Sequence, residues 1–429
     1  MLIEFSVKNY RSIRDKQTFS MAAGSAKEMF DENTFNSGIA RLPNLLKLAV
    51  VYGPNAAGKS NFVKAIQFMR QFVKLSSKDS QQGERIEVIP FLFDKENRSV
   101  PSEFEVVFVQ EQVRYQYGFS VTSQNVTAEW LIAYPQGKPQ RWFERMYNPE
   151  TGKTKWHFSP KFTGKREVWK EATRTNALFL STAIQLNNQQ LKPVFDWFNV
   201  VLRIMPPIAQ EDLNIKYTFK KCETGEGKKN VLDFMNAADI TIADIEVNTE
   251  PLMPEKLPDD MPQDMKDAFL KMIEGADKEP KLTSCKMHHK TGAADERVTL
   301  DLGEESDGTK KLFSLAGVWM HLLSEGLILV VDELDNSLHP LLLRFLVKLL
   351  QNPEVNKNNA QLIVATHNTA LLDSEILRRD QVWFMERDDS SASRLYPLSD
   401  FSPRKNEAIG KGYLQGRYGA VPFIGQWVF

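Results

Sequence analysis

Residues 45–60 of this chain read LLKLAVVYGPNAAGKS, and they indicate which kind of fold to expect. Leu45–Tyr52 is a compact apolar run, which predicts a buried strand. Gly53–Ser60 follows and matches the pattern G-x-x-x-x-G-K-[ST], and Asn61–Val73 then has apolar residues at helical spacing. The order of strand, glycine loop and helix therefore predicts a phosphate-binding loop whose backbone N–H groups and helix dipole hold phosphates.

Single residues of this loop have distinct predicted roles. The backbone at Gly53, Asn55 and Gly58 would surround the phosphates, because glycine allows close backbone approach. Lys59 would place a cation on the β- and γ-phosphates of ATP, and the Ser60 hydroxyl would ligate Mg²⁺. A chance glycine turn is the alternative, and the flanking strand and helix argue against it.

A second motif combines a buried strand with two acids. Leu327–Val331 is apolar and leads directly into Asp332 and Glu333. In open α/β sheets, ligands bind at the carboxyl ends of the strands. Asp332 would hold Mg²⁺ through water, and Glu333 would polarise the attacking water as general base. Two acids that simply begin a surface loop are the alternative, which the intact phosphate loop makes much weaker.

The spacing of these motifs selects among the classes of phosphate-loop ATPase. Asp332 lies roughly 270 residues after Lys59, a gap that the ABC class tolerates because a second lobe intervenes. That class also needs a signature helix shortly before the acidic strand, and Leu302–Lys310 has this position. Ser306 would cap this helix with its hydroxyl outward, and Gly308 would allow close approach to a phosphate. An ordinary capped helix start is the alternative.

Three further side chains are candidates for the same site. His367 follows the apolar run Gln361–Ala365, where an ABC protein has its γ-phosphate-sensing histidine. Gln185 lies where predicted strands give way to predicted helices. It could be the glutamine that follows the metal and the attacking water in ABC proteins, and the absence of any such role is an equal alternative. Arg11 follows the first strand and could reach the phosphates, and a surface arginine is an equal alternative.

Composition excludes several functions. The 429 residues are 42% hydrophobic and 25% charged with a formal net charge of −1, so no global basic field would drive strong DNA binding, although a local basic face stays open. Apolar runs are strand-length, and no signal peptide is evident, so we expect a cytoplasmic protein without membrane contact. Cys222 and Cys285 predict no disulfide framework, and with His288 and His289 they fit no standard zinc pattern.

The order of strand-like and helix-like segments along the chain predicts an α/β fold. We expect an ABC-type ATPase head with a mostly parallel core sheet, an inserted antiparallel β subdomain and a helical lobe. We expect an N-terminal ATPase lobe over residues 1–175, a helical lobe with a mobile insertion near 250–280 over 176–295, and a C-terminal ATPase lobe over 296–429. The antiparallel strands should lie between Arg85 and Trp169, and further helices should cover Thr309–Leu323 and Pro340–Leu350.

These motifs resemble the ABC-class ATPases of the SMC, RecF and OLD group. Lys8–Ile13 looks like that group's opening strand and loop, and Asn61 looks like its trailing asparagine beside the phosphate loop. Glu305–Thr309 and Tyr413–Pro422 look most like the stand-alone RloA or AbiL-type ATPases of prokaryotic defence loci. OLD-type nucleases continue into a metal-binding Toprim domain. Only about 60 residues follow His367, so we expect no nuclease site here.

The resemblance implies an ATP- and Mg²⁺-dependent switch in an anti-phage system. ATP would lie between Lys59 of one subunit and Ser306 of another, in a homodimer or a higher even oligomer. Engagement of the subunits would gate a separately encoded effector, such as a nuclease or a toxin. A RecF-like ATPase of DNA repair and an ATP-binding scaffold with little turnover are the alternatives, and a nucleic-acid partner stays open.

Overall fold

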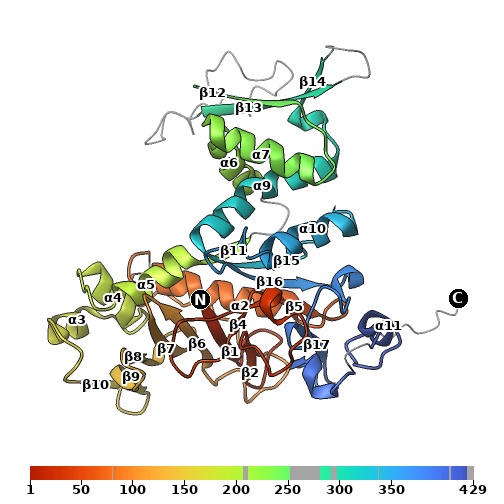
Figure 1. The fold of residues 1–429 in the computed structure, drawn as a ribbon. Helices are drawn as coiled ribbons and strands as arrows, with labels where there is room; N and C mark the ends of the chain where they lie inside the picture. The colour runs from red at the N-terminus through yellow and green to blue at the C-terminus, as the bar shows by residue number, and fades with distance from the viewer. Residues whose placement is uncertain are drawn as a thin grey trace, which may run out of the picture. The chain divides into compact units, whose positions relative to one another are not determined.

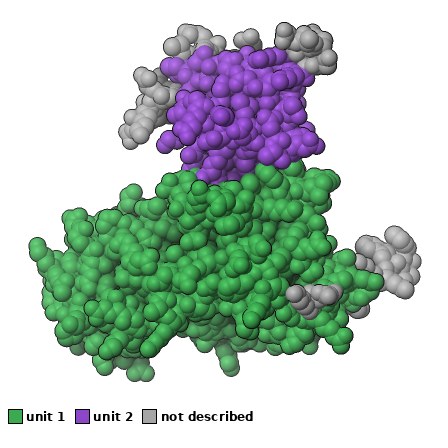
Figure 2. Space-filling model, in the orientation of Figure 1, with its two compact units in different colours: residues 1–207, 321–429 green, residues 208–320 purple. Residues whose placement is uncertain are grey.

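The computed structural model describes residues 1–79, 81–205, 211–251, 281–290, 297–336, 338–404 and 407–422. It divides into two compact units, one formed by Met1–Pro207 with His321–Phe429 and the other by Ile208–Met320 (Figure 2). The expected lobes 1–175, 176–295 and 296–429 therefore do not coincide with these units. Residues 176–205 belong with the first unit because their apolar side chains join its core. The insertion expected near 250–280 lies almost wholly outside the described residues.

A six-stranded sheet positions the motifs of the first unit. Its order is β11-β15-β16-β5-β17-β18, and all neighbours are parallel except β17 and β18. The strand that precedes the phosphate loop lies between two others and is completely buried. The α/β prediction is confirmed. The strands are β5 (Leu48–Tyr52), β11 (Leu202–Met205), β15 (Ile328–Asp332), β16 (Gln361–Thr366), β17 (Val382–Arg387) and β18 (Ser393–Pro397).

A seven-stranded antiparallel sheet forms the second layer of this unit, in the order β10-β9-β8-β7-β6-β1-β2. The expected antiparallel strands are present, and the N-terminal strand β1 pairs with β6, so it joins this sheet. The strands are β1 (Leu2–Lys8), β2 (Gln17–Ser20), β6 (Ser102–Gln110), β7 (Val113–Val121), β8 (Val126–Tyr134), β9 (Gln140–Asn148) and β10 (Lys153–Phe158). A small ladder joins β3 (Thr34–Phe35) to β4 (Leu45–Leu46).

Helix α2 (Lys59–Leu75) lies between the two sheets (Figure 1). Its aromatic side chains face the antiparallel sheet: the Phe62 ring packs edge-on to Phe5 at 5.8 Å, and Phe72 lies 5.4 Å from Phe119. Apolar residues of both sheets and of α2 form one buried cluster. Because the helix is buried on both sides, its first residue, Lys59, is fixed at the carboxyl end of the parallel sheet.

The remaining helices of the first unit are short except for one. The helix expected at Pro340–Leu350 is confirmed as α10. The others are α1 (Phe30–Asn33), α3 (Arg166–Ala172), α4 (Phe179–Gln185), α5 (Lys192–Asp196) with the π-helical η1 (Trp197–Val201), α10 (Pro340–Gln351) and α11 (Ile409–Leu414). Three 3₁₀ turns complete the set: η5 (Thr369–Leu371), η6 (Arg379–Gln381) and η7 (Leu398–Phe401).

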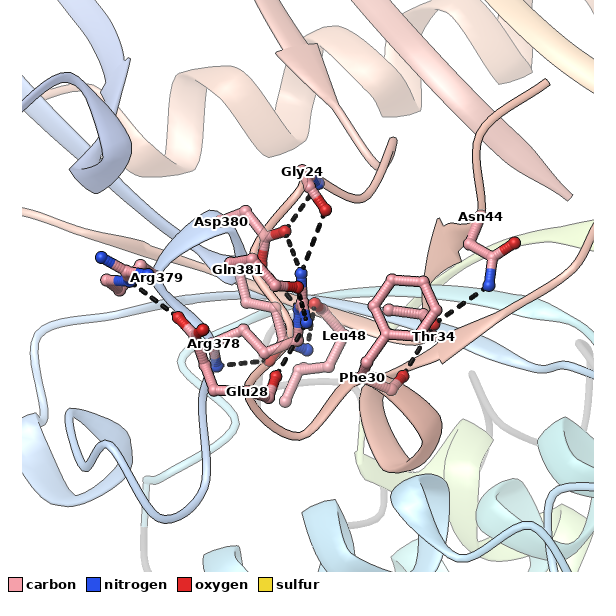
Figure 3. Close-up of polar contacts among 11 residues, drawn as sticks. Gly24, Glu28, Phe30, Thr34, Asn44, Leu48, Arg378, Arg379, Asp380 and Gln381 are labelled. Atoms are coloured by element: carbon pink, nitrogen blue, oxygen red, sulfur yellow. Dashed lines mark hydrogen bonds and ion pairs between the residues drawn. The ribbon is translucent and has the colours of Figure 1, made fainter. Parts of the chain in front are cut away.

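A fully buried arginine holds the loop before α1 (Figure 3). Arg378 donates hydrogen bonds to the carbonyl oxygens of Gly24, Ala26 and Glu28 at 3.4, 2.8 and 2.8 Å. Its charge is paired with Asp380, whose Oδ2 lies 2.7 Å from Arg378 Nη2. The Nε atom also donates to Asp380 Oδ1 at 3.0 Å, so all three nitrogens of the buried guanidinium are satisfied, and a polar network holds this loop.

In its described residues, the second unit combines three helices with a small sheet. Strands β12 (Asp244–Pro251), β13 (Lys281–Lys290) and β14 (Arg297–Asp301) pair antiparallel, and α6 (Glu211–Cys222) and α7 (Gly225–Ala237) precede them. The 3₁₀ turn η4 (Leu302–Glu304) leads into α9 (Asp307–Glu325), whose last residues belong to the first unit. The helical lobe expected over 176–295 therefore also contains β12 and β13. Because charged residues occupy the outward faces of these strands, the alternation of apolar and polar positions was not apparent from the sequence.

No helix in the described part of the chain combines the length and apolarity that a membrane span requires.

Candidate nucleotide-binding site

Both glycines of the phosphate-binding loop are required by close contacts. The loop connects β5 to α2, and Gly58 at its end has a φ of +110°. A Cβ on Gly58 would lie 2.1 Å from the Ser393 hydroxyl oxygen, and one on Gly53 would lie 2.2 Å from the Met385 carbonyl oxygen. The loop therefore lies directly against β17 and β18, and no larger residue fits at either position.

Hydroxyl groups from distant segments hold the loop in place. The Ser393 hydroxyl donates to the Ala57 carbonyl oxygen at 2.7 Å and lies 2.8 Å from the hydroxyl of Ser12. The amide of Asn61 donates to the same Ser12 oxygen at 2.8 Å. The trailing asparagine thus ties the start of α2 to the segment after β1. Sequence reading missed Ser12 and Ser393, because no local pattern marks them.

The lysine of the loop is nearly buried and folds back onto the loop itself. Lys59 is 7% exposed, and its Nζ donates to the carbonyl oxygens of Gly53 at 2.7 Å and Pro54 at 3.0 Å. Burial lowers the pKa of Lys59, and the nearby Asp332 opposes this shift. An ammonium held in this way can exchange its carbonyl partners for phosphate oxygens, which would form stronger, charge-assisted hydrogen bonds.

Asp332 ends β15 beside the loop with one carboxylate oxygen unsatisfied. Its Oδ1 is buried and has no hydrogen-bond partner, while the Ser60 hydroxyl hydrogen-bonds to the carboxylate. Burial raises the pKa of Asp332, and Ser60 and Lys59 oppose the rise. A hydroxyl and an orphaned carboxylate oxygen fit Mg²⁺, which prefers few protein ligands and keeps waters and phosphate oxygens. No group of three or more His, Cys, Asp or Glu side chains that could hold a metal ion occurs among the described residues.

The raised pKa of Asp332 leads us to expect a pH-dependent contribution of this residue to the free energy of unfolding. Because the native state binds this proton more tightly than the unfolded chain does, stability falls as pH rises through the folded-state pKa. At pH 7, Asp332→Asn removes an ionised and partly desolvated carboxylate. We expect the nucleotide-free variant to melt at a higher temperature than the wild type, with a smaller difference near about pH 4. Thermal unfolding at both pH values measures this.

The exposed Asp79 supplies the control, since Asp79→Asn should leave the melting temperature unchanged at both pH values. A lower melting temperature of Asp332→Asn at pH 7 would contradict the expectation.

Glu333 adopts an unusual backbone conformation that fixes its carboxylate. Its φ is +57°, in the left-handed region, and its N–H donates to the Ala365 carbonyl oxygen at 2.8 Å. The side-chain amide of Asn336 donates to Glu333 Oε2 at 2.8 Å. Sequence reading missed Asn336, which holds the predicted general base in one orientation. Strain of this kind is typical of functional sites.

One cavity, of about 670 Å³, is lined by the phosphate-binding loop and by Glu333. Its lining combines a polar part from the phosphate loop with an apolar part that begins at Ile89. Leu92 and Phe93 are 50% and 70% exposed although both are large and apolar. Such a wall beside a phosphate loop suits the flat face of a purine base. The lining includes seven residues with predicted roles: Arg11, Asn55, Gly58, Lys59, Ser60, Asn61 and Glu333.

Arg11 lines the cavity through a short structured turn. Its N–H donates to the Ile89 carbonyl oxygen at 2.8 Å, and its Nε donates to the Tyr10 hydroxyl at 3.1 Å. This places Arg11 between the polar and the apolar part of the lining. A contact between Arg11 and the phosphates stays a prediction.

Of the residues that were predicted for this site in the first unit, four do not line the cavity: Gly53, Asp332, Gln185 and His367. His367 is exposed directly after β16, whose neighbour β15 ends at Asp332. Gln185 is exposed at the end of α4. The side chain that does join β16 to the acidic segment is Thr366, whose hydroxyl donates to Asp335 Oδ1 at 2.5 Å. The roles of His367 and Gln185 stay predictions.

The predicted signature residues lie in the second unit at the start of α9. The Ser306 oxygen accepts a hydrogen bond from the Thr309 N–H at 3.2 Å and lies 2.9 Å from the Thr309 hydroxyl. Ser306 is exposed, and Gly308 follows within the first turn. The helix cap expected from the sequence is therefore present. Contact of Ser306 and Gly308 with a phosphate of another subunit stays a prediction.

The zinc reading of the cysteine and histidine residues finds no support in the second unit. His288 and His289 are consecutive in β13, so their side chains leave opposite faces of the sheet. Burial raises the pKa of Cys285 to about 12 and that of Cys222 to about 11, which favours neutral thiols.

Several solved structures are similar to this chain over most of its length. The SMC head domain from Thermotoga maritima is 13% identical and aligns with 92% of this chain and 98% of its own, with a TM-score of 0.41. An SMC head bound to the C-terminal winged-helix domain of ScpA is 13% identical over 94% and 99%, with a TM-score of 0.41. The recombination mediator RecF with ATPrS is 13% identical over 92% and 98%, with a TM-score of 0.35. No curated protein matches.

A family of sequences matches more than half of the chain. The match covers residues 48–181, which contain the phosphate-binding loop, and residues 246–373, which contain the acidic strand. These are the two segments that the parallel sheet brings together at the cavity. The chain belongs to the family described as "AAA domain, putative AbiEii toxin, Type IV TA system".

Proposed function

We propose that this chain is an ATP-hydrolysing switch of the ABC class. The observation that carries the proposal is the shared cavity: Glu333 lines the same space as Lys59 and Ser60, although roughly 270 residues separate them in sequence. A phosphate loop alone would support binding only. A half-buried carboxylate held toward the same cavity adds the group that hydrolysis requires.

The residues divide the chemistry among them. Lys59 would neutralise the β- and γ-phosphates, and Ser60 with Asp332 would hold Mg²⁺. The metal would supply charge neutralisation on the phosphate oxygens as negative charge develops. Glu333, oriented by Asn336, would accept a hydrogen bond from the attacking water and take its proton. The apolar wall at Leu92 and Phe93 would hold the base in place.

We further propose that the complete site is composite. ATP held by Lys59 of one subunit would meet Ser306 and Gly308 of another, in a homodimer or a higher even oligomer. The exposed position of Ser306 at a capped helix start supports this, because its hydroxyl and the first N–H groups of α9 are open to an approaching phosphate. Such a protein would be a slow ATPase as a monomer, and turnover per chain should rise with protein concentration.

The family description names a toxin and a toxin–antitoxin system, and this supports a role in defence. We propose that the chain belongs to the RloA or AbiL-type ATPases of anti-phage systems and gates an effector encoded beside it. ATP-dependent engagement of two subunits would set the state of that effector, and hydrolysis would reset it.

The direct test of the nucleotide site is Lys59→Ala. We expect the affinity for ATP to fall roughly tenfold or more, because the variant loses the one cation that the loop directs at the phosphates. Titration with ATP by isothermal calorimetry measures this, and phosphate release from Mg²⁺–ATP measures turnover. The matched control is Lys78→Ala, an exposed lysine just after α2. If the wild type released no phosphate at any protein concentration, the proposed hydrolysis would be wrong.

A further inference from the structure

We propose that His289 and Glu305 form a clasp that holds the signature serine, Ser306, in the orientation in which it meets ATP of the opposite subunit. His289 Nε2 lies 2.6 Å from Glu305 Oε1, the distance of a strong hydrogen bond. His289 would be a positioning residue that acts through Glu305. The inference rests on the proposed composite site.

The alternation of side chains along β13 places His289 on the same face as two buried residues. Along β13 the side chains of Cys285 and Met287 are buried, and His289 continues the same face two residues later. Two apolar positions on the inner face are thus followed by a polar ring. A polar group on a half-buried face needs a partner, and the Glu305 carboxylate is that partner.

The Glu305 N–H donates to the Leu302 carbonyl oxygen at 3.3 Å, and among the described residues its carboxylate is paired with His289. On one side, the turn η4 is closed by Glu304, whose Oε2 accepts from the Asp301 N–H at 2.9 Å. On the other side, Ser306 is held by its cap on Thr309. Between them the Glu305 side chain is only 7% exposed, and His289 is 27% exposed. The bond to His289 therefore connects the peptide next to Ser306 to the sheet.

Loss of the imidazole would leave a largely desolvated carboxylate without its partner. Such a group turns outward to regain water, and it takes the adjoining backbone with it. Since a shift of about 1 Å at a reacting centre can reduce a rate by roughly 100-fold, the signature should lose most of its effect. The phosphate loop of the same chain lies in the other unit and should still bind ATP.

The first experiment compares His289→Ala with His289→Gln and His288→Ala. Gln retains a nitrogen that can donate to Glu305. His288 is the matched control, because it lies on the opposite face and contacts Thr299 at 2.9 Å and Glu246 at 3.6 Å. For His289→Ala we expect kcat to fall about tenfold or more with unchanged ATP affinity, and we expect His289→Gln to recover most of it. His288→Ala should behave like the wild type.

A mixing experiment shows in which subunit the clasp acts. A Lys59→Ala subunit lacks the phosphate-binding lysine but carries an intact signature. A His289→Ala subunit carries the lysine but an impaired signature. An equimolar mixture should regain phosphate release well above either variant alone, because one composite site of the pair is intact. The mixture of Lys59→Ala with Ser306→Ala is the positive control and should regain activity in the same way.

The outcomes separate the two proposals. If Ser306→Ala alone hydrolyses ATP at the wild-type rate, the composite site fails. If Ser306→Ala is impaired and its mixture recovers while His289→Ala keeps wild-type turnover, the composite site stands and the clasp is refuted. The clasp is equally refuted if the His289→Ala mixture stays inactive, or if His288→Ala loses as much activity as His289→Ala.

Discussion

Glu333→Gln should reduce the rate of ATP hydrolysis by about 10²–10⁴-fold, the usual contribution of a general base. Gln keeps the size of the side chain and can still pair with Asn336, which now holds Glu333 Oε2 at 2.8 Å. It cannot accept a proton at neutral pH. The phosphate loop is unchanged, so we expect ATP affinity to stay near that of the wild type and ATP-bound dimers to accumulate. Phosphate release and light scattering with Mg²⁺–ATP measure the two effects.

Glu354→Gln is the control for this prediction, because Glu354 is exposed after α10 and does not line the cavity. It should hydrolyse ATP like the wild type. A Glu333→Gln protein that still turned over ATP within a few-fold of the wild-type rate would show that another group activates the water. A variant that lost ATP binding as well would indicate that Glu333 supports the loop and not the chemistry.

Glu129→Ala should lower the free energy of unfolding by about 3–5 kcal/mol, the range for a buried ion pair that loses one partner. Glu129 on β8 and Arg145 on β9 are 0% and 4% exposed, and Arg145 Nε lies 2.9 Å from Glu129 Oε2. Burial lowers the pKa of Arg145, and Glu129 opposes this shift. Without the carboxylate, the guanidinium would remain in the core with the Ala177 carbonyl oxygen and the ring of Trp156 as its partners among the described residues.

The carboxylate also holds the start of α4. It accepts hydrogen bonds from the backbone N–H groups of Phe179 at 2.7 Å and Leu180 at 3.0 Å. These are helix N–H groups that have no partner within the helix itself. Loss of Glu129 would therefore loosen the helix that ends at Gln185, in addition to exposing a buried charge to the apolar core.

Urea unfolding followed by tryptophan fluorescence measures this loss as a shift of the midpoint. The control is Glu167→Ala, which removes an exposed partner of Lys170 at 2.7 Å and should change stability by less than about 1 kcal/mol. The double variant Glu129→Leu with Arg145→Met removes both charges and should be more stable than Glu129→Ala alone. If Glu129→Ala unfolded within about 1 kcal/mol of the wild type, the pair would not stabilise this sheet.

The sequence was most informative where a function needs contiguous residues. The helix after the glycine loop and the apolar strand that ends at Asp332 lie within two residues of their expected bounds. The strand expected over Leu45–Tyr52 begins at Leu48, because Leu45 and Leu46 pair with β3 in a separate ladder. The Ser306 cap on α9 is also present as expected. Each of these features depends on backbone conformation and side chains within about one turn or strand, which local residue type determines directly.

Sequence reading was weakest between residues 203 and 301. It expected a helical lobe over residues 176–295, whereas β12 and β13 within that range form a sheet with β14. Lys286 and His288 alternate with buried Cys285 and Met287, but a strand with one solvated face and few residues resembles a charged loop. The same alternation separates His288 from His289 and gives them different partners.

By itself, the sequence determined the strand, glycine loop and helix around Lys59 and the buried strand that ends in Asp332, because these features depend on local residue type. Only the tertiary structure decided what surrounds them. Ser12 and Ser393 hold the loop, Asn336 holds Glu333, and Phe93 forms an apolar wall. Such partners come from segments that meet only when two sheets pack on α2. The spacing of residues along the chain does not indicate which of them become neighbours across a packed core.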